Sequence, residues 1–210
     1  MRSDLVFWEV DAQADFMLPG GKLYVPGAEK LLPNLRRLTD AARSGEVFLV
    51  SHGCFHPEGD PEFATFPPHC LQGTVGAQLV PEALTEKVAK VPNLPSASLP
   101  ADLSKFQQIL LEKQTLNIFE SCHADALVER LPREAEFVVF GVVTEYCVRF
   151  AAMGLRERGR RVSVVRDAIE TLNPADGHRT IAELQSLGVR MISTDQALAL
   201  AKAKPASKAG

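Results

Sequence analysis

The chain has 210 residues, of which 46% are hydrophobic and 23% are charged, and its formal net charge is -3. This length can bury a sizeable core and suits one large α/β domain. The slightly acidic charge argues against a nucleic-acid-binding protein, whose binding surface would be basic. No apolar run approaches the ~18 residues of a transmembrane helix, and the acidic start does not resemble a signal peptide. These features predict a cytoplasmic protein with neither a nucleic-acid nor a membrane partner.

Six short apolar runs predict strands that are buried on both faces of a sheet. The first is Leu5–Val10, which is followed by Asp11. The others are 47–50, 109–111, 137–140, 162–165 and 189–192. Most of these runs are β-branched or aromatic and do not alternate with polar residues, which is typical of parallel strands.

Five helical patterns lie between or after these runs, at 28–43, 121–131, 145–158, 175–187 and 194–202. In the first pattern, Leu31, Leu35 and Leu38 fall near one face, and Pro33 is placed in the first turn or at a kink. Strands that alternate with helices indicate βαβ crossovers. We therefore predict an α/β fold with three α/β/α layers and a mostly parallel, doubly wound sheet of about six strands. A single domain is expected over residues 1–202, with a disordered tail at 203–210.

The segment 51–100 interrupts this alternation. It is rich in proline, glycine and histidine. It is also too long for an ordinary connection between two elements, which indicates a functional segment.

The four cysteines are Cys54, Cys70, Cys122 and Cys147, and none of them forms a Cys-x-x-Cys pair. A reducing compartment would keep all four thiols free. Each cysteine could pack, bind a metal or act as a nucleophile. Packing is the prediction for Cys70 and Cys122.

Three chemically suitable residues follow predicted strands. Asp11 follows the first, Lys113 the third and Cys147 the fourth, and ligands of open α/β sheets bind beyond the carboxyl ends of strands. A helix N-terminus and a lysine would both lower the pKa of the Cys147 thiol. Asp11 could accept the thiol proton, and backbone amides could bind an oxyanion. The alternative is that Cys147 is an ordinary small core residue.

Four blocks of the sequence, taken together, resemble the isochorismatase-like cysteine hydrolases, a family that includes nicotinamidases. The blocks are 7–16 (FWEVDAQADF), 67–74 (PPHCLQGT), 111–119 (LEKQTLNIF) and 141–148 (GVVTEYCV). They occur in the order that the family has, and the resemblance extends from about Leu5 to Leu198.

The resemblance implies a role for each catalytic candidate. Asp11 would be the general base, Lys113 would hold the acid and the substrate, and Cys147 would attack a carbonyl carbon. This attack would give an acyl-thioester and release ammonia or an amine. The family also has a cis peptide bond at the position between Val142 and Val143, and the amide of Val143 would join that of Cys147 in the oxyanion hole.

The resemblance also implies a metal site. Nicotinamidases of the family bind a divalent metal through an aspartate and three histidines. The corresponding residues here are Cys54, His56, Glu62 and His69. Zinc accepts sulfur, nitrogen and oxygen ligands, and a thiolate favours it over magnesium or manganese. The alternative is a site that has lost its metal. His52 is a poorer candidate ligand, and no organic cofactor is expected.

Several side chains near these blocks could contact a substrate. Phe16, Phe66 and Tyr146 could stack on a flat ring, or could simply pack within loops. Gln13 and Asp15 could bind substrate, and Asp15 could equally stabilise the first loop.

The sequence therefore predicts a cysteine-dependent amidohydrolase that acts on a small amide, with nicotinamide as the first choice of substrate. One alternative is hydrolysis of another small amide, or of the vinyl ether of isochorismate. Another is a non-catalytic binding protein that keeps the fold. Members of the family are often dimers or tetramers, so a homo-oligomer is expected.

Overall fold

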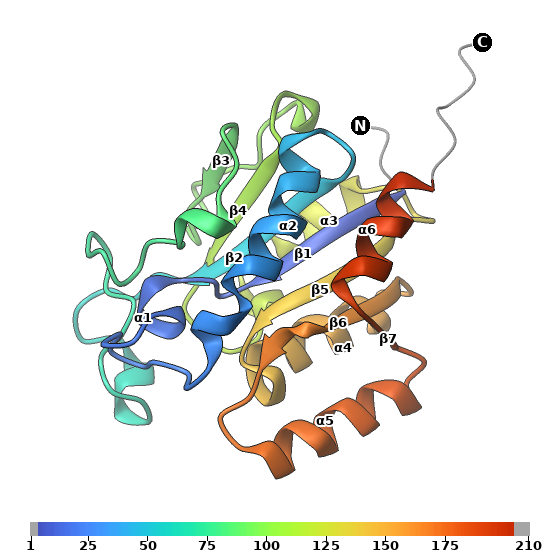
Figure 1. Ribbon diagram of the computed structural model, residues 1–210. Helices are drawn as coiled ribbons and strands as arrows, with labels where there is room; N and C mark the ends of the chain where they lie inside the picture. Colours follow the sequence, from blue (N-terminus) through green and yellow to red (C-terminus); the bar gives the residue numbers. More distant parts are fainter. Residues whose placement is uncertain (1–3, 204–210) are drawn as a thin grey trace.

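The computed structural model describes residues 4–203, and its centre is a parallel sheet of seven strands in the order β3-β4-β2-β1-β5-β6-β7 (Figure 1). The strands are β1 (Leu5–Val10), β2 (Phe48–Cys54), β3 (Val88–Val91), β4 (Gln108–Lys113), β5 (Glu136–Val142), β6 (Arg161–Glu170) and β7 (Arg190–Ile192). Each neighbouring pair is parallel. The predicted fold class is confirmed, with one more strand than expected. The extra strand is β3, a four-residue edge strand that lies inside the segment 51–100.

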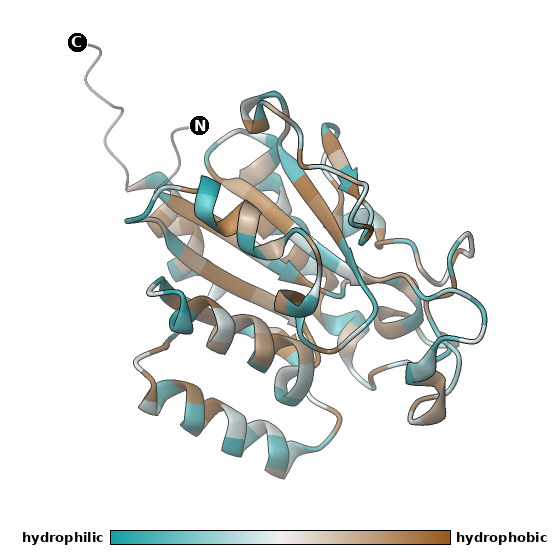
Figure 2. Ribbon diagram, turned by 180° about the vertical axis from the view of Figure 1, so that it is seen from behind, coloured by the Kyte–Doolittle hydropathy of each residue, from teal (hydrophilic) through white to brown (hydrophobic). Residues whose placement is uncertain are grey.

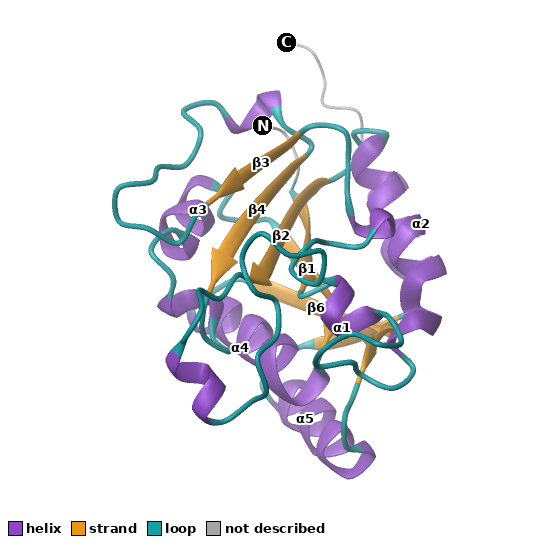
Figure 3. Cartoon of the chain, turned by 90° about the vertical axis from the view of Figure 1, so that its left-hand side faces the viewer, coloured by secondary structure: helices purple, strands orange, loops and turns teal. Residues whose placement is uncertain are grey.

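Helices cover both faces of the sheet, which gives three layers (Figure 3). They are α1 (Ala14–Met17), α2 (Leu32–Arg43), α3 (Ala124–Arg130), α4 (Arg149–Glu157), α5 (Pro174–Ser186) and α6 (Thr194–Lys202). Side chains of α2 and α6 pack in one hydrophobic cluster, and those of α3 and α4 pack in the other. Phe7 belongs to the first cluster and Trp8 to the second, because successive side chains of β1 point to opposite faces.

Apolar residues concentrate along the central strands, as the hydropathy colours show (Figure 2). Trp8, Phe7, Phe137 and Phe140 are among the largest fully buried side chains. Within residues 4–203, no helix combines the length and the apolar character that crossing a membrane would need.

Local sequence signals account for several helix boundaries. Pro33 lies in the first turn of α2, where its missing N–H is tolerated. The side chain of Asn173 accepts hydrogen bonds from two backbone amides at the start of α5, and Ser193 and Gln196 form a capping box at the start of α6. The disordered tail predicted at 203–210 lies outside the described residues except for Ala203, which caps the end of α6.

Two predicted helices begin differently from expectation. The helix expected at 145–158 starts as a wide turn over Thr144–Val148, in which the amide of Val148 donates to the carbonyl of Val143 at 3.1 Å. Tyr146 has non-helical dihedral angles in this turn, and regular helix begins only at Arg149. The helix expected at 121–131 begins at Ala124.

A buried polar network links the three strands β1, β2 and β4 within the sheet. The Ser51 hydroxyl donates to Glu9 at 2.6 Å, and the Gln108 amide donates to the Ser51 oxygen at 2.6 Å. Burial raises the pKa of Glu9 to about 8, although the hydrogen bond from Ser51 opposes this shift. Glu9 is therefore neutral when the folded protein is at pH 7.

We expect Glu9→Gln to remove a pH dependence of stability. Unfolded Glu9 loses its proton near its ordinary pKa of 4.5, whereas the folded group keeps it to about 8. The stabilisation is therefore full below pH 4.5 and is lost as pH rises through 8. Between pH 5 and pH 8, wild type should lose roughly 3 to 4 kcal/mol of unfolding free energy relative to Glu9→Gln in urea titrations. An unchanged difference between the two proteins would contradict this.

Gly141 allows β1 and β5 to approach where both strands end. It pairs with Val10, has a φ of 119°, and a Cβ there would lie 2.0 Å from the Val10 carbonyl oxygen. Only glycine fits this position without a shift of the backbone. The close approach places the residues that follow Val10 and Gly141 beside each other.

Gly141→Ala should lower the unfolding free energy by about 3 kcal/mol or more, because the strained φ and the backbone clash add. Gly159→Ala is the matched control, since Gly159 has a φ of 71° and no atom within 4 Å of the added Cβ. The control should lose only about 1 kcal/mol. Urea unfolding of both variants measures this, and equal losses would show that the clash at Gly141 is unimportant.

Candidate active site

Three of the predicted site residues meet around one buried ammonium group. The Nζ atom of Lys113, the last residue of β4, lies 3.0 Å from Asp11 Oδ2 and 3.6 Å from Cys147 Sγ. Asp11 directly follows β1, and Cys147 lies in the wide turn after β5. Parallel strands bring these ends to the same edge of the sheet, so the strand order itself assembles the group.

The ion pair between Asp11 and Lys113 sets the charges of this group. Burial alone would raise the pKa of Asp11, but Lys113, His52 and Cys147 together lower it to about 2. Burial opposes the charge of Lys113, and Asp11 with the neighbouring thiols still raises its pKa well above the ordinary value. Both members of the pair are therefore charged at neutral pH.

The thiol of Cys147 is protonated in the resting site. Burial raises its pKa, Asp11 raises it further, and Lys113 only partly opposes them. The prediction of a lowered pKa is wrong, because burial and the Asp11 carboxylate outweigh the effect of Lys113. The arrangement is that of a neutral thiol beside an ionised acid.

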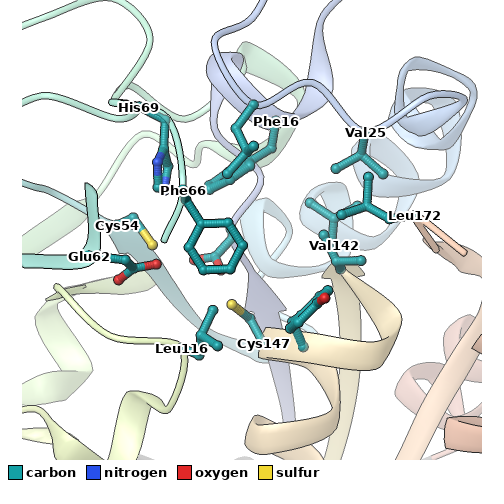
Figure 4. A pocket seen from close by; sticks show the side chains of 14 residues that line it. Phe16, Val25, Cys54, Glu62, Phe66, His69, Leu116, Val142, Cys147 and Leu172 are labelled. Carbon is teal, nitrogen blue, oxygen red and sulfur yellow. The ribbon is translucent and has the colours of Figure 1, made fainter. Parts of the chain in front are cut away.

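A mostly apolar cavity of about 530 Å³, including space open to solvent, leads to Cys147 (Figure 4). Phe16, Phe66 and Tyr146 line it, together with Val143. The Phe66 and Tyr146 rings meet edge to face, with centroids 6.3 Å apart. All three aromatic residues predicted to contact substrate thus border the cavity. The peptide bond between Val142 and Val143 is cis, in agreement with the expectation from the resemblance.

Three of the four predicted metal ligands form a compact cluster beside this cavity. The ligand atoms of Cys54, His56 and His69 lie within 4.8 Å of one another, and all three residues are buried. Glu62 also lines the cavity, and its Oε2 lies 4.0 Å from His56 Nε2. In Figure 4, Cys54, Glu62 and His69 lie on the same side of the cavity.

The outer contacts of the two histidines are suited to metal binding. His56 Nδ1 lies 3.1 Å from the carboxylate of Asp60, and His69 Nδ1 lies 2.9 Å from the carbonyl of Pro67. Partners of this kind orient metal-binding imidazoles and leave Nε2 for the ion. The sequence reasoning missed Asp60, although its position four residues after His56 could have indicated it.

The thiol of Cys54 touches both parts of the site. Its Sγ lies 2.8 Å from Lys113 Nζ, and burial raises its pKa to about 12 in the absence of a metal. Gln13 holds the backbone of Cys54 on both sides, because its amide donates to the Cys54 carbonyl at 2.5 Å and its Oε1 accepts from the Cys54 amide at 2.7 Å. Gln13 therefore supports the site and does not line the cavity.

The remaining candidates have structural contacts. Asp15 accepts hydrogen bonds from the backbone amides of Cys70 at 2.7 Å and Lys22 at 3.0 Å, and so it joins two loops. All four cysteines are free. Cys70 is buried as predicted, whereas Cys122 is exposed, so the prediction that it packs is wrong.

Comparisons with known proteins agree with this geometry. The chain matches the Isochorismatase domain family over residues 5–92 and 95–196. It is 27% identical to a nicotinamidase of Escherichia coli over 205 residues, which cover 87% of this chain and 91% of that protein. It is also 27% identical to a nicotinamidase of Saccharomyces cerevisiae over 192 residues, covering 75% and 84% of the two chains.

A solved structure is similar over nearly its whole length. The pyrazinamidase of Pyrococcus horikoshii in complex with zinc superposes with a TM-score of 0.71 and 27% identity, covering 90% of this chain and 99% of the other. The match to the family extends over both halves of the sheet and all the residues grouped around Lys113. The chain belongs to the isochorismatase family of hydrolases.

Proposed function

We propose that this protein is a cysteine-dependent amidohydrolase that cleaves a small, uncharged amide, with nicotinamide the first choice. The observation that carries the proposal is the contact of Lys113 with both Asp11 and Cys147 beside an apolar cavity. The names of the two nicotinamidases and of the pyrazinamidase support the choice of an aromatic amide.

In the proposed first step, Cys147 Sγ attacks the amide carbonyl carbon while Asp11 accepts the thiol proton. Lys113 keeps the acid ionised until then, and it stabilises the negative charge that develops on sulfur. The backbone amides of Val143 and Cys147 bind the oxyanion. Asp11 then returns the proton to the departing nitrogen, which leaves as ammonia, and an acyl-thioester remains on Cys147.

In the second step, water attacks the thioester carbonyl, and Asp11 accepts a proton from this water. The carbon–sulfur bond breaks, the acid product leaves, and the thiol regains its proton from Asp11. The same carboxylate therefore acts once in each half of the cycle.

The cavity wall favours a neutral substrate over an acidic one. Asp11 and Glu62 are its acidic lining residues, and none of the described lining residues is a lysine or an arginine. Isochorismate is a dicarboxylate, and no lysine or arginine of the described cavity lining would pair with its two charges. We therefore rank a small amide above isochorismate. The rings of Phe16, Phe66 and Tyr146 would contact a flat acyl group.

A divalent metal, with zinc the first choice, would be held by Cys54, His56, Glu62 and His69. The compact cluster of Cys54, His56 and His69, and the contacts that orient both imidazoles, support this assignment. The zinc of the similar pyrazinamidase supports it too. When bound, the metal would supply a Lewis acid for a ring nitrogen or for water. The nucleophile is activated by Asp11 and Lys113 and not by the metal.

Three broader expectations also stand as proposals. We propose a single domain over residues 1–202, a homo-oligomer and a cytoplasmic location. The two clusters of buried side chains share one sheet, which supports the single domain. The binding-protein alternative is less favoured, because such a protein would not need Lys113 to contact both an acid and a thiol.

Cys147→Ala should reduce ammonia release from nicotinamide by at least about a thousandfold, because it removes the sulfur that carries the acyl intermediate in this mechanism. Cys122→Ala is the matched control, since Cys122 is exposed and free. It should retain wild-type activity in the same coupled ammonia assay. Equal rates for wild type and Cys147→Ala would contradict the assignment. A wild type that is inactive on a panel of small amides would favour the binding-protein alternative.

Purified protein should contain one zinc per chain by elemental analysis, and Cys54→Ser and His69→Ala should lower this content. Cobalt-loaded wild type should show a thiolate-to-cobalt absorption band in the near ultraviolet. Cys54→Ser should lose this band because it lacks the sulfur ligand. Cys122→Ser, which changes an exposed thiol, should keep it. A band that persists in Cys54→Ser would exclude Cys54 as a ligand.

A further inference from the structure

A second side chain faces the carboxylate of Asp11, on the oxygen that Lys113 does not contact. His52 Nδ1 lies 3.6 Å from Asp11 Oδ1, whereas Lys113 Nζ lies 3.0 Å from Oδ2. His52 belongs to β2, in the middle of the sheet, and its side chain is fully buried. The two oxygens of the carboxylate therefore have different neighbours.

The surroundings of His52 do not explain why a polar side chain occupies this position. Among the described residues, neither ring nitrogen has a hydrogen-bond partner. Its ring lies 6.0 Å from that of Trp8, within the apolar side of the sheet. A buried polar group without a partner costs about 1–3 kcal/mol, so an apolar residue would serve packing better at this position. The Asp11 Oδ1 atom, 3.6 Å from His52 Nδ1, also lacks a hydrogen-bond partner among the described residues.

The backbone holds the two residues in register. His52 pairs with Val10 between β2 and β1, and the Asp11 amide donates to the His52 carbonyl at 2.9 Å. Asp11 has a φ of 49°, which turns the chain at the end of β1. The backbone contacts therefore hold His52 beside Asp11 independently of any contact between their side chains.

We propose that His52 is a positioning residue that donates from Nδ1 to Asp11 Oδ1 and fixes the plane of this carboxylate toward Cys147. The inference rests on the proposed function, in which Asp11 takes the thiol proton. A separation of 3.6 Å is longer than a formed hydrogen bond, and such contacts in an active site commonly tighten when substrate binds. Lys113 would set the charge of Asp11, and His52 would set its orientation.

Two substitutions separate this role from packing. His52→Asn places an amide nitrogen near the position of Nδ1 and keeps the donor. His52→Leu keeps the volume and the apolar contact with Trp8 but removes the donor. If His52 only fills space, Asn should be the more harmful change, because it is smaller and polar. If His52 positions Asp11, Leu should be the more harmful change.

The expected result for metal-loaded protein and nicotinamide is a kcat at least about tenfold lower in His52→Leu, with KM within about twofold of wild type. His52→Asn should keep kcat within about threefold of wild type. Leu at wild-type rate, or Asn as impaired as Leu, would overturn the inference. If His52→Leu does not fold by thermal unfolding, His52→Gln replaces it, since its amide reaches the Nε2 position and should give the same loss.

A second measurement is independent of the substrate. The rate at which iodoacetamide alkylates Cys147, located by peptide mass spectrometry, should fall in His52→Leu, because a displaced Asp11 carboxylate accepts the thiol proton less readily. His52→Asn should alkylate near the wild-type rate. A wild type without amidase activity would refute the proposed function, and the alkylation rates would still judge His52. Equal alkylation of wild type and His52→Leu would overturn the positioning role.

Discussion

The buried ammonium of Lys113 is the interaction on which the rest of the site depends. A fully buried lysine is stable only where nearby groups compensate its charge, and here Asp11 lies 3.0 Å away. The same Nζ atom reaches Cys147 and Cys54, so it connects three strand ends and the turn after β5. Removing this charge would leave the carboxylate of Asp11 buried and uncompensated.

This arrangement would let a protonated thiol and an ionised carboxylate act together in the proposed reaction. Asp11 is ionised and Cys147 is protonated at neutral pH, so proton transfer is expected only when a carbonyl carbon is within reach of sulfur. Cys54 adds to this balance. As a neutral thiol it leaves the charge of Lys113 to Asp11. Binding of a metal by Cys54 would change its charge and thereby link the two halves of the site.

The sequence predicted those parts of the fold that depend on local patterns. The apolar runs indicated six strands. Asp11, Lys113 and Cys147 were predicted to follow strand ends, and in the structure they lie together at one edge of the sheet. The edge strand β3 was not predicted, because its four residues include a lysine and form no clear apolar run. The wide turn at Cys147 was not predicted, because the spacing of apolar residues does not distinguish it from the first turn of a regular helix.

The parts that depend on tertiary contacts could not be predicted in this way. His52 is seen to face Asp11 only when β1 and β2 are in register, and Asp60 is seen to face His56 only when the following loop folds back. The raised pKa of Cys147 follows from burial that no spacing of residues reveals. The exposure of Cys122 could not be predicted either, since a single cysteine shows no periodicity that places it on a buried or an exposed face.

In the proposed reaction, Cys147 carries the acyl group of a small amide. Rapid acid quenching during turnover of nicotinamide, followed by peptide mass spectrometry, detects this intermediate. We expect a nicotinoyl mass increment on the peptide that contains Cys147, and hydroxylamine should remove it as it removes a thioester. An increment on Cys54 or on another residue, or turnover without any adduct on Cys147, would contradict the proposed reaction.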